Sequence, residues 1–169
     1  MRVIILLLVA AGLGSWYWNR QNSISEESVN RFYQTETEHF MNGRSKELCA
    51  MLTKDFVRIG VNSTSQGRIR ENANKEESCD KLTKMFGALA QSAQLSTEYR
   101  ITINHIEIAP DNKSAEVTKT TYISMGIDSI GRVAETSDKS TDTLVIRNGR
   151  VLLQKSEGGG ITRTIGDRF

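Results

Sequence analysis

The groups in this sequence that could bind a ligand or move a proton are few and widely separated. Tyr33 and Glu36 lie one helical turn apart in a stretch with apolar residues at helical spacing, and Tyr99 and His105 follow in a stretch of alternating polarity. Phenol, carboxylate and imidazole groups act as general acids and bases when one cavity brings them together. These four residues are therefore candidates for the polar lining of a small-ligand site.

Each of these groups also has a plainer interpretation. Glu36 falls on the apolar stripe of its helix, but we expect it to flank the stripe and reach solvent, because carboxylates are rarely buried. His105 could line a cavity as a base, but a lone histidine is more often structural. His39 follows Glu38 on the same helix and is expected at the surface.

Two cysteines, Cys49 and Cys79, fall on the apolar faces of two expected helices. In an exported domain they would form a disulfide that closes a loop of about thirty residues and adds on the order of 3 kcal/mol of stability. Two buried free thiols are the alternative in a reducing compartment. The pair lacks the spacing of a zinc site. Gly158–Gly160 is not followed by Lys-Ser/Thr, so it is no phosphate loop. We expect no catalytic residue, no metal and no cofactor.

The chain begins with an export signal. Met1-Arg2 precedes sixteen uncharged residues, Val3 to Trp18, and Asn19-Arg20-Gln21 ends the run. A membrane span needs about 17–25 apolar residues, so the segment fits either a cleaved signal or a short anchor. Trp16, Tyr17 and Trp18 suit the aromatic belt of a retained anchor. We expect membrane contact through residues 3–18 and an extracytoplasmic domain, with signal cleavage and a periplasmic or secreted protein as the alternative.

The remainder of the chain has no net charge. Arg2 and Arg20 are the charged residues among the first twenty, and removing them from the 22 basic residues leaves 20, equal to the 20 acidic ones. A neutral domain has no electrostatic field to attract polyphosphate, so nucleic-acid binding is disfavoured.

Three helical patterns follow a short polar linker at residues 21–25. Ser23 and Glu26 suggest a capping box, and apolar residues from Val29 to Phe40 share one face before Asn42-Gly43 ends the helix. A shorter helix starts at Ser45 and gives way to a β segment near Asp55-Phe56. Residues 60–72 are polar and rich in turn formers, which predicts a loop. A third helix starts at Asn74 with a stripe that includes Leu82 and Phe86.

From Ser96 the apolar period changes to two, which predicts four antiparallel strands. A slip in the alternation predicts a bulge near Asn104-His105. The polar segment Glu135–Thr143 fits an exposed extension of the sheet, and Asn148-Gly149 between two apolar runs predicts a hairpin. Gly158–Gly160 is expected to open a flexible tail over residues 158–169. The domain proper would then span residues 26–157.

This order predicts an α+β domain in which three N-terminal helices pack on a curved, mainly antiparallel sheet of four to five strands, preceded by one apolar helix. The passage with Asn42-Gly43, the short helix with Leu48, Met51 and Leu52, and Asp55-Phe56 resembles the nuclear transport factor 2-like superfamily, the cystatin-like cone fold. The resemblance covers roughly residues 25–157. It implies a cone that hosts isomerases, dehydratases, transport factors or assembly modules.

The chain departs from the superfamily's catalytic patterns. The aspartate of members similar to ketosteroid isomerase would fall near Gly60, with no carboxylate at Ile59 or Val61. A site similar to scytalone dehydratase needs a histidine pair, and this chain has only His39 and His105. No base therefore stands at the matching places.

These observations support three hypotheses. The first is a non-catalytic, membrane-anchored extracytoplasmic module that binds protein partners, with homodimerisation through the sheet implied by the resemblance. The second is a small-ligand binder or isomerase- or dehydratase-like enzyme that uses the cone, lined by the four polar residues named first. The third is a periplasmic protein released by signal cleavage.

Overall fold

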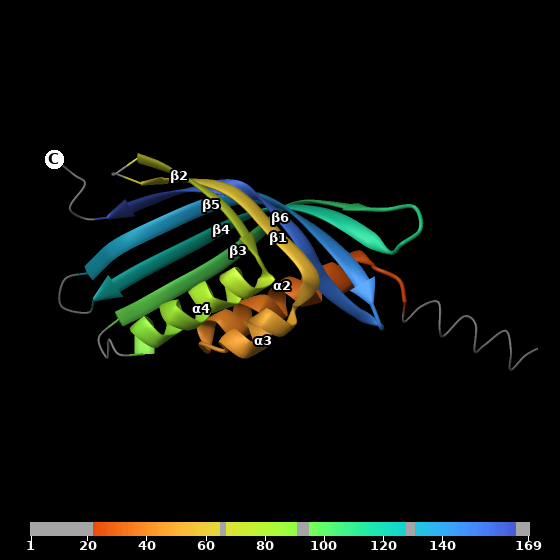
Figure 1. Ribbon diagram of the computed structural model, residues 1–169, viewed down its shortest axis with the longest axis horizontal. Coiled ribbons are helices and arrows are strands. Elements are labelled where there is room, and N and C mark those ends of the chain that lie inside the picture. Colours follow the sequence, from red (N-terminus) through yellow and green to blue (C-terminus); the bar gives the residue numbers. More distant parts are fainter. Residues whose placement is uncertain (1–21, 65–66, 91–94, 128–130, 165–169) are drawn as a thin grey trace, which may run out of the picture.

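The computed structural model describes residues 22–64, 67–90, 95–127 and 131–164. Its helices pack against the concave side of one curved sheet, so the architecture is α+β as predicted (Figure 1). The helices are α2 (Glu26–Met41), α3 (Ser45–Ala50) and α4 (Lys75–Ala90). The strands are β1 (Leu52–Thr64), β2 (Gly67–Asn74), β3 (Leu95–Ile108), β4 (Ser114–Ile127), β5 (Gly131–Arg147) and β6 (Arg150–Thr164).

The sheet has six described strands in the order β2-β1-β6-β5-β4-β3, and β1 pairs parallel to β6 while the other neighbours are antiparallel. The prediction of four to five strands was too low because residues 60–72 are not a loop. They form most of a β1–β2 hairpin, in which Gly60 pairs with Glu71. Its strands lack the usual apolar alternation because inward positions such as Arg58, Asn62 and Glu71 are polar.

The N-terminal end of the domain is more ordered than a linker. Ser25, not Ser23, caps α2, and it forms a capping box with Ser28. Ile24 is buried, and its backbone N–H donates to the Asn112 carbonyl oxygen at 2.7 Å. The predicted linker at residues 21–25 is therefore wrong for its described part, which is fixed to the β3–β4 turn.

The C-terminal glycines belong to β6, so the predicted flexible tail from residue 158 is wrong as far as Thr164. A Cβ on Gly158 would lie 2.4 Å from the Lys139 carbonyl oxygen, and one on Gly159 would lie 2.5 Å from the Val61 carbonyl oxygen. Glycine is present here because neighbouring strands approach too closely for a side chain. The domain consequently extends beyond residue 157.

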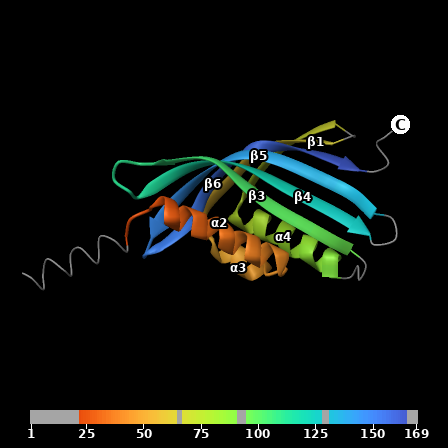
Figure 2. The same ribbon diagram turned by 180° about the vertical axis from the view of Figure 1, so that it is seen from behind.

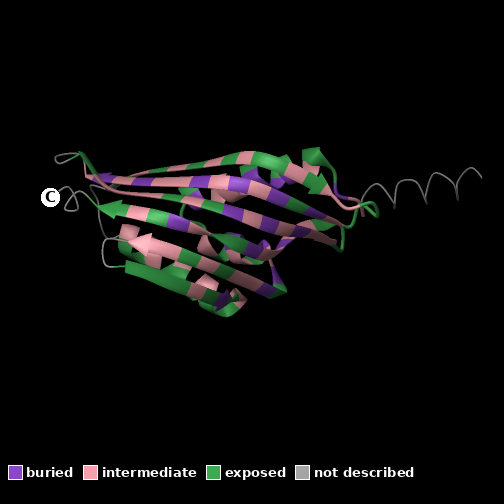
Figure 3. Cartoon of the chain, turned by 90° about the horizontal axis from the view of Figure 1, so that it is seen from above, coloured by how far each residue is buried: buried purple, intermediate pink, exposed green. Residues whose placement is uncertain are grey.

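Burial alternates along the strands (Figure 3), and the helices cover one face of the sheet (Figure 2). The predicted bulge is confirmed by a register shift between Ile103 and His105. The predicted exposed extension at Glu135–Thr143 is wrong in part, because Ser140 and Asp142 are buried. Their inward positions follow from Leu144, which lies on the same face of β5 and belongs to the core.

Candidate functional site

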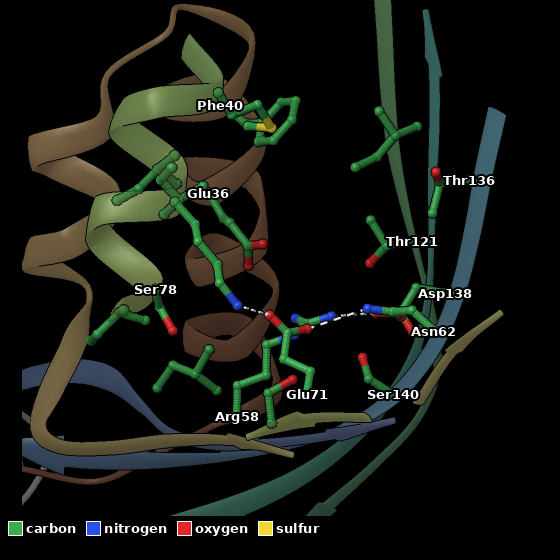
Figure 4. Close-up of a pocket in the computed structure, with 18 of the residues that line it drawn as sticks. Glu36, Phe40, Arg58, Asn62, Glu71, Ser78, Thr121, Thr136, Asp138 and Ser140 are labelled. Atoms are coloured by element: carbon green, nitrogen blue, oxygen red, sulfur yellow. Dashed lines mark hydrogen bonds and ion pairs between the residues drawn. The ribbon is translucent and has the colours of Figure 1, made fainter. Parts of the chain in front are cut away.

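A cavity of about 790 Å³ lies between the helices and the concave face of the sheet (Figure 4). Much of its wall is apolar and comes from both layers. Phe32 and Phe40 reach it from α2, Leu82 and Met85 from α4, and Ile123 from β4. Phe40 stacks on the Tyr99 ring, with the ring centroids 3.9 Å apart, and this contact joins α2 to β3. The core residues thus surround the cavity without filling it.

Glu36 carries its carboxylate into this cavity from α2 (Figure 4). Its Oε1 accepts a hydrogen bond from the Tyr99 hydroxyl at 2.8 Å and lies 3.6 Å from Lys119 Nζ. Its Oε2 is buried and has no hydrogen-bond partner among the described residues. The side chain is 18% exposed, so the prediction that Glu36 flanks the stripe and reaches solvent is wrong. The apolar stripe of α2 turns it inward.

A buried ion pair stands behind Glu36. Lys119 Nζ lies 2.9 Å from Asp142 Oδ2, and the Tyr33 hydroxyl donates to the same oxygen at 3.0 Å. Lys119 also lies over the Tyr33 ring, 4.8 Å from its centroid, which is a cation–π arrangement. Lys119 thus contacts Asp142, the Tyr33 ring and Glu36 Oε1, and it links the ion pair to Glu36.

The protonation states of this group follow from burial and charge. Burial, with the negative charge of Glu36 beside it, raises the pKa of Tyr99 well above its usual value, so this phenol stays a hydrogen-bond donor. Burial and Asp142 raise the pKa of Tyr33 as well. Burial alone would lower the pKa of Lys119, but Glu36 and Asp142 more than offset it and leave that pKa raised.

A second polar group faces the same cavity from the β1–β2 hairpin and β5 (Figure 4). The Arg58 guanidinium contacts Glu71 at 3.1 Å and Asp138 at 3.0 Å, and Lys81 of α4 lies 2.7 Å from Glu71. Burial would raise the pKa of Glu71, but Lys81 and Arg58 outweigh it and lower that pKa. Ion pairs therefore join the hairpin to both α4 and β5 across the cavity.

The structure gathers three of the four predicted ligand-site residues and places the fourth elsewhere. Glu36 and Tyr99 are bonded to each other, and Tyr33 reaches them through Asp142 and Lys119. His105 does not join them, because the bulge in β3 leaves its side chain exposed. The expected surface position of His39 is also wrong, since it is only partly exposed and its Nδ1 is buried.

Sequence reasoning missed the residues that complete both polar groups, which are Arg58, Glu71, Lys81, Lys119, Asp138 and Asp142. A signal for three of them was present in the period-two alternation. Lys119 occupies the inward face between Val117 and Thr121, and Asp138 and Asp142 continue the face of Leu144 backwards along β5. Arg58 and Glu71 fell in or beside the segment interpreted as a loop.

The two cysteines form a disulfide, as predicted, which joins α3 to α4 with their Cα atoms 5.6 Å apart. The bond secures a cavity wall, because Leu48 on α3 and Ser78 on α4 both line the cavity beside it. None of the residues of α4 is fully buried, so this helix depends on such tethers.

The expected membrane residues Trp16, Tyr17 and Trp18 lie outside the described residues, as does the whole apolar run from residue 3 to residue 18. Within residues 22–164, as far as they are described, no helix is long and apolar enough to cross a membrane.

Comparison with known proteins gives the fold alone. No protein-family model and no curated protein matches the sequence. Among solved structures, a putative scytalone dehydratase from Novosphingobium aromaticivorans is 14% identical with a TM-score of 0.60, over 85% of this chain and 94% of that one. A hexachlorocyclohexane dehydrochlorinase is 10% identical with a TM-score of 0.52, over 78% and 82%.

A third similar structure belongs to a different class of protein. It is a putative calcium/calmodulin-dependent protein kinase II association domain from Xanthomonas campestris, 13% identical with a TM-score of 0.56, over 78% of this chain and 84% of that one. Enzymes and an association domain therefore share the arrangement of this chain, and the site itself must decide between them. The chain shares the curved α+β fold of these solved structures.

Proposed function

We propose that this protein binds a small, largely apolar organic molecule in its cone and that Glu36 receives a hydrogen bond or a proton from it. The observation that carries the proposal is the carboxylate of Glu36, a residue that lines the cavity: one oxygen is held by Tyr99 and Lys119, and the other is buried without a hydrogen-bond partner among the described residues. A buried acceptor without a partner costs stability, which a ligand donor would recover.

The size and lining of the cavity support this proposal. Ligand sites typically enclose about 300–1,000 Å³ and combine apolar walls with a few fixed polar groups. The cavity of this chain has about 790 Å³ and aromatic and aliphatic side chains around Glu36. Tyr99 and Lys119 fix the carboxylate before a ligand arrives, which lowers the entropic cost of binding.

The test is a fluorescence titration with 2-naphthol, an apolar bicycle with one hydroxyl donor, and with naphthalene, which has none. We expect 2-naphthol to bind roughly tenfold more tightly than naphthalene, the ratio for one hydrogen bond to a charged acceptor. Glu36→Gln should abolish that preference, whereas Glu27→Gln, at an exposed position of the same helix, should preserve it. Equal affinity of the wild-type protein for both compounds would refute the proposal.

A second experiment separates an enzyme from a binder. A carboxylate with a free oxygen in an apolar cavity can remove a proton from carbon next to a carbonyl group. 2-Tetralone in D₂O offers such a proton, and its exchange for deuterium is visible by ¹H NMR. Exchange accelerated by the wild-type protein and lost in Glu36→Gln indicates proton-transfer catalysis. Binding of 2-naphthol without faster exchange indicates a binding protein.

Protein contact through the convex face of the sheet is a second candidate. Ile59, Val61 and Ile161 are exposed large aliphatic residues, and their strand positions alternate with those of the cavity-lining Arg58, Asn62 and Thr162. They therefore share the convex face across β1 and β6. A second copy of the chain would cover them. Concentration-dependent sedimentation that Val61→Lys abolishes would support a homodimer, and a monomer at all concentrations would refute it.

The membrane location remains part of this second candidate, and the uncharged run from Val3 to Trp18 supports it. Mass spectrometry of the mature protein tests it. Retention of Met1 to Trp18 in a membrane fraction resistant to alkaline extraction would support an anchor. A soluble protein that starts within residues 10–20 would instead indicate a cleaved signal.

A further inference from the structure

Three of the four cationic side chains that line the cavity have a carboxylate partner, and the fourth, Arg70, is exposed. Lys119 pairs with Asp142 at 2.9 Å, Lys81 with Glu71 at 2.7 Å, and Arg58 with two carboxylates at 3.0 and 3.1 Å. An anionic ligand would have to displace these carboxylates or lie beside them. Away from the exposed Arg70, the cavity therefore offers little to a carboxylate or a phosphate.

The uncommitted polar atoms are mainly acceptors, and they lie on two opposite walls. Glu36 Oε2 belongs to the helical wall and Asp138 Oδ1 to the sheet wall (Figure 4), and both are buried without a hydrogen-bond partner among the described residues. Arg58 fixes the other oxygen of Asp138, as Tyr99 fixes the other oxygen of Glu36. Each carboxylate is thus held by one oxygen, while its other oxygen is buried without a hydrogen-bond partner among the described residues.

We infer that the ligand carries at least two hydrogen-bond donors on an apolar frame, as a diol or a dihydroxyaromatic compound does, and that Asp138 is the specificity-determining residue for the second donor. This inference rests on the proposed function of the site, since Glu36 would receive the first donor. Asp138 Oδ1 accepts a hydrogen bond from the ligand's second hydroxyl. A methoxy group at that place has no proton to donate, so its oxygen and Asp138 Oδ1 would face each other as two acceptors. Specificity of this kind arises because unmatched buried polar groups are costly.

Three probes with one frame test the inference: 2,6-dihydroxynaphthalene, 6-methoxy-2-naphthol and 6-hydroxy-2-naphthoic acid. We expect the diol to bind about tenfold more tightly than the methoxy compound, and the carboxylate to bind most weakly of the three. In Asp138→Asn the new carbonyl can still accept from Arg58, which turns the amide N–H groups towards the ligand. The preference for the diol should then disappear or reverse in favour of the methoxy compound.

The ratio of affinities is measured within each variant, so partial misfolding cannot imitate the result. Asp80→Asn, at an exposed carboxylate of α4, should keep the wild-type ratio. Equal affinity of the wild-type protein for diol and methoxy compound, or tightest binding of the carboxylate, would overturn the inference. If 2-naphthol still binds through Glu36 in that case, the proposed function stands and the role of Asp138 alone falls. If no naphthalene derivative binds, both fall.

Discussion

Lys119 Nζ lies 2.9 Å from Asp142 Oδ2, and these two side chains, 8% and 0% exposed, form an ion pair inside the cone. They come from neighbouring strands, β4 and β5, at positions where most domains of this size would have aliphatic residues. Burying both charges is costly, and the cost is offset only while each has its partner. The pair lies at the boundary between the hydrophobic core and the candidate functional site.

Removing one member of this pair should be far more damaging than removing an exposed charge. We expect Lys119→Met to lower the free energy of unfolding by about 3–5 kcal/mol, because Asp142 and Glu36 lose their counter-charge. Lys84→Met, in the exposed pair of Lys84 with Asp80, should cost no more than about 0.5 kcal/mol. Urea denaturation measures both. Similar losses in the two variants would show that the buried pair is solvated.

The same cluster predicts a loss of stability at alkaline pH. The pKa values of Tyr33, Tyr99 and Lys119 are raised in the folded state above 10.0 for tyrosine and 10.5 for lysine. The unfolded chain therefore releases these protons first, and stability falls as pH rises above about 10, by up to about 1.4 kcal/mol per pH unit for each proton. Urea denaturation between pH 8 and 11.5 should show this slope. Tyr99→Phe should reduce this slope by the contribution of one proton. An unchanged slope would contradict a contribution from Tyr99.

The disulfide between Cys49 and Cys79 should contribute to both stability and binding. Replacing both cysteines by alanine removes the tether between α3 and α4, and we expect a loss of about 3 kcal/mol in urea denaturation. Because α4 forms a cavity wall, affinity for 2-naphthol should fall as well. Dithiothreitol should reproduce these effects in the wild-type protein and have none on the double variant. A loss below about 1 kcal/mol would show that the helices hold without the bond.

The glycines of β6 should be intolerant of a side chain. Gly158→Ala would force a Cβ to within 2.4 Å of the Lys139 carbonyl oxygen, so we expect a loss of about 1–3 kcal/mol from the displaced backbone. The control is Gly87→Ala in α4, where nothing lies within 4 Å and alanine should stabilise the helix by up to about 1 kcal/mol. Thermal denaturation distinguishes the two. A neutral Gly158→Ala would show that β5 and β6 can separate at this point.

The general architecture could be predicted because the apolar periodicity and turn residues of the sequence agree with the burial and turns found in the fold. The apolar stripe of α2 and the alternation along β4 each follow one period, and Asn148-Gly149 adopts the positive φ angles of a tight hairpin. The bulge before His105 could be predicted for the same reason, because a bulge shifts the alternation by one residue.

The site could not be predicted to the same extent because its polar residues occupy inward positions. Arg58 and Asn62 face the cavity while Ile59 and Val61 face outwards, which reverses the pattern from which strands are recognised. The sequence of the β1–β2 hairpin therefore predicted a loop. Glu71 lies in that segment and was not recognised as a candidate site residue. Such reversals of a local rule are expected where a fold forms a binding site.

The central claim is that the free oxygen of Glu36 receives the donor of a ligand in the cone, and a crystal structure of the complex with 2-naphthol tests it most directly. We predict the naphthol oxygen about 2.5–3.0 Å from Glu36 Oε2, with the ring system against Phe40 and Met85. Naphthol bound only outside the cone, or in the cone with its hydroxyl turned away from Glu36, would contradict the claim.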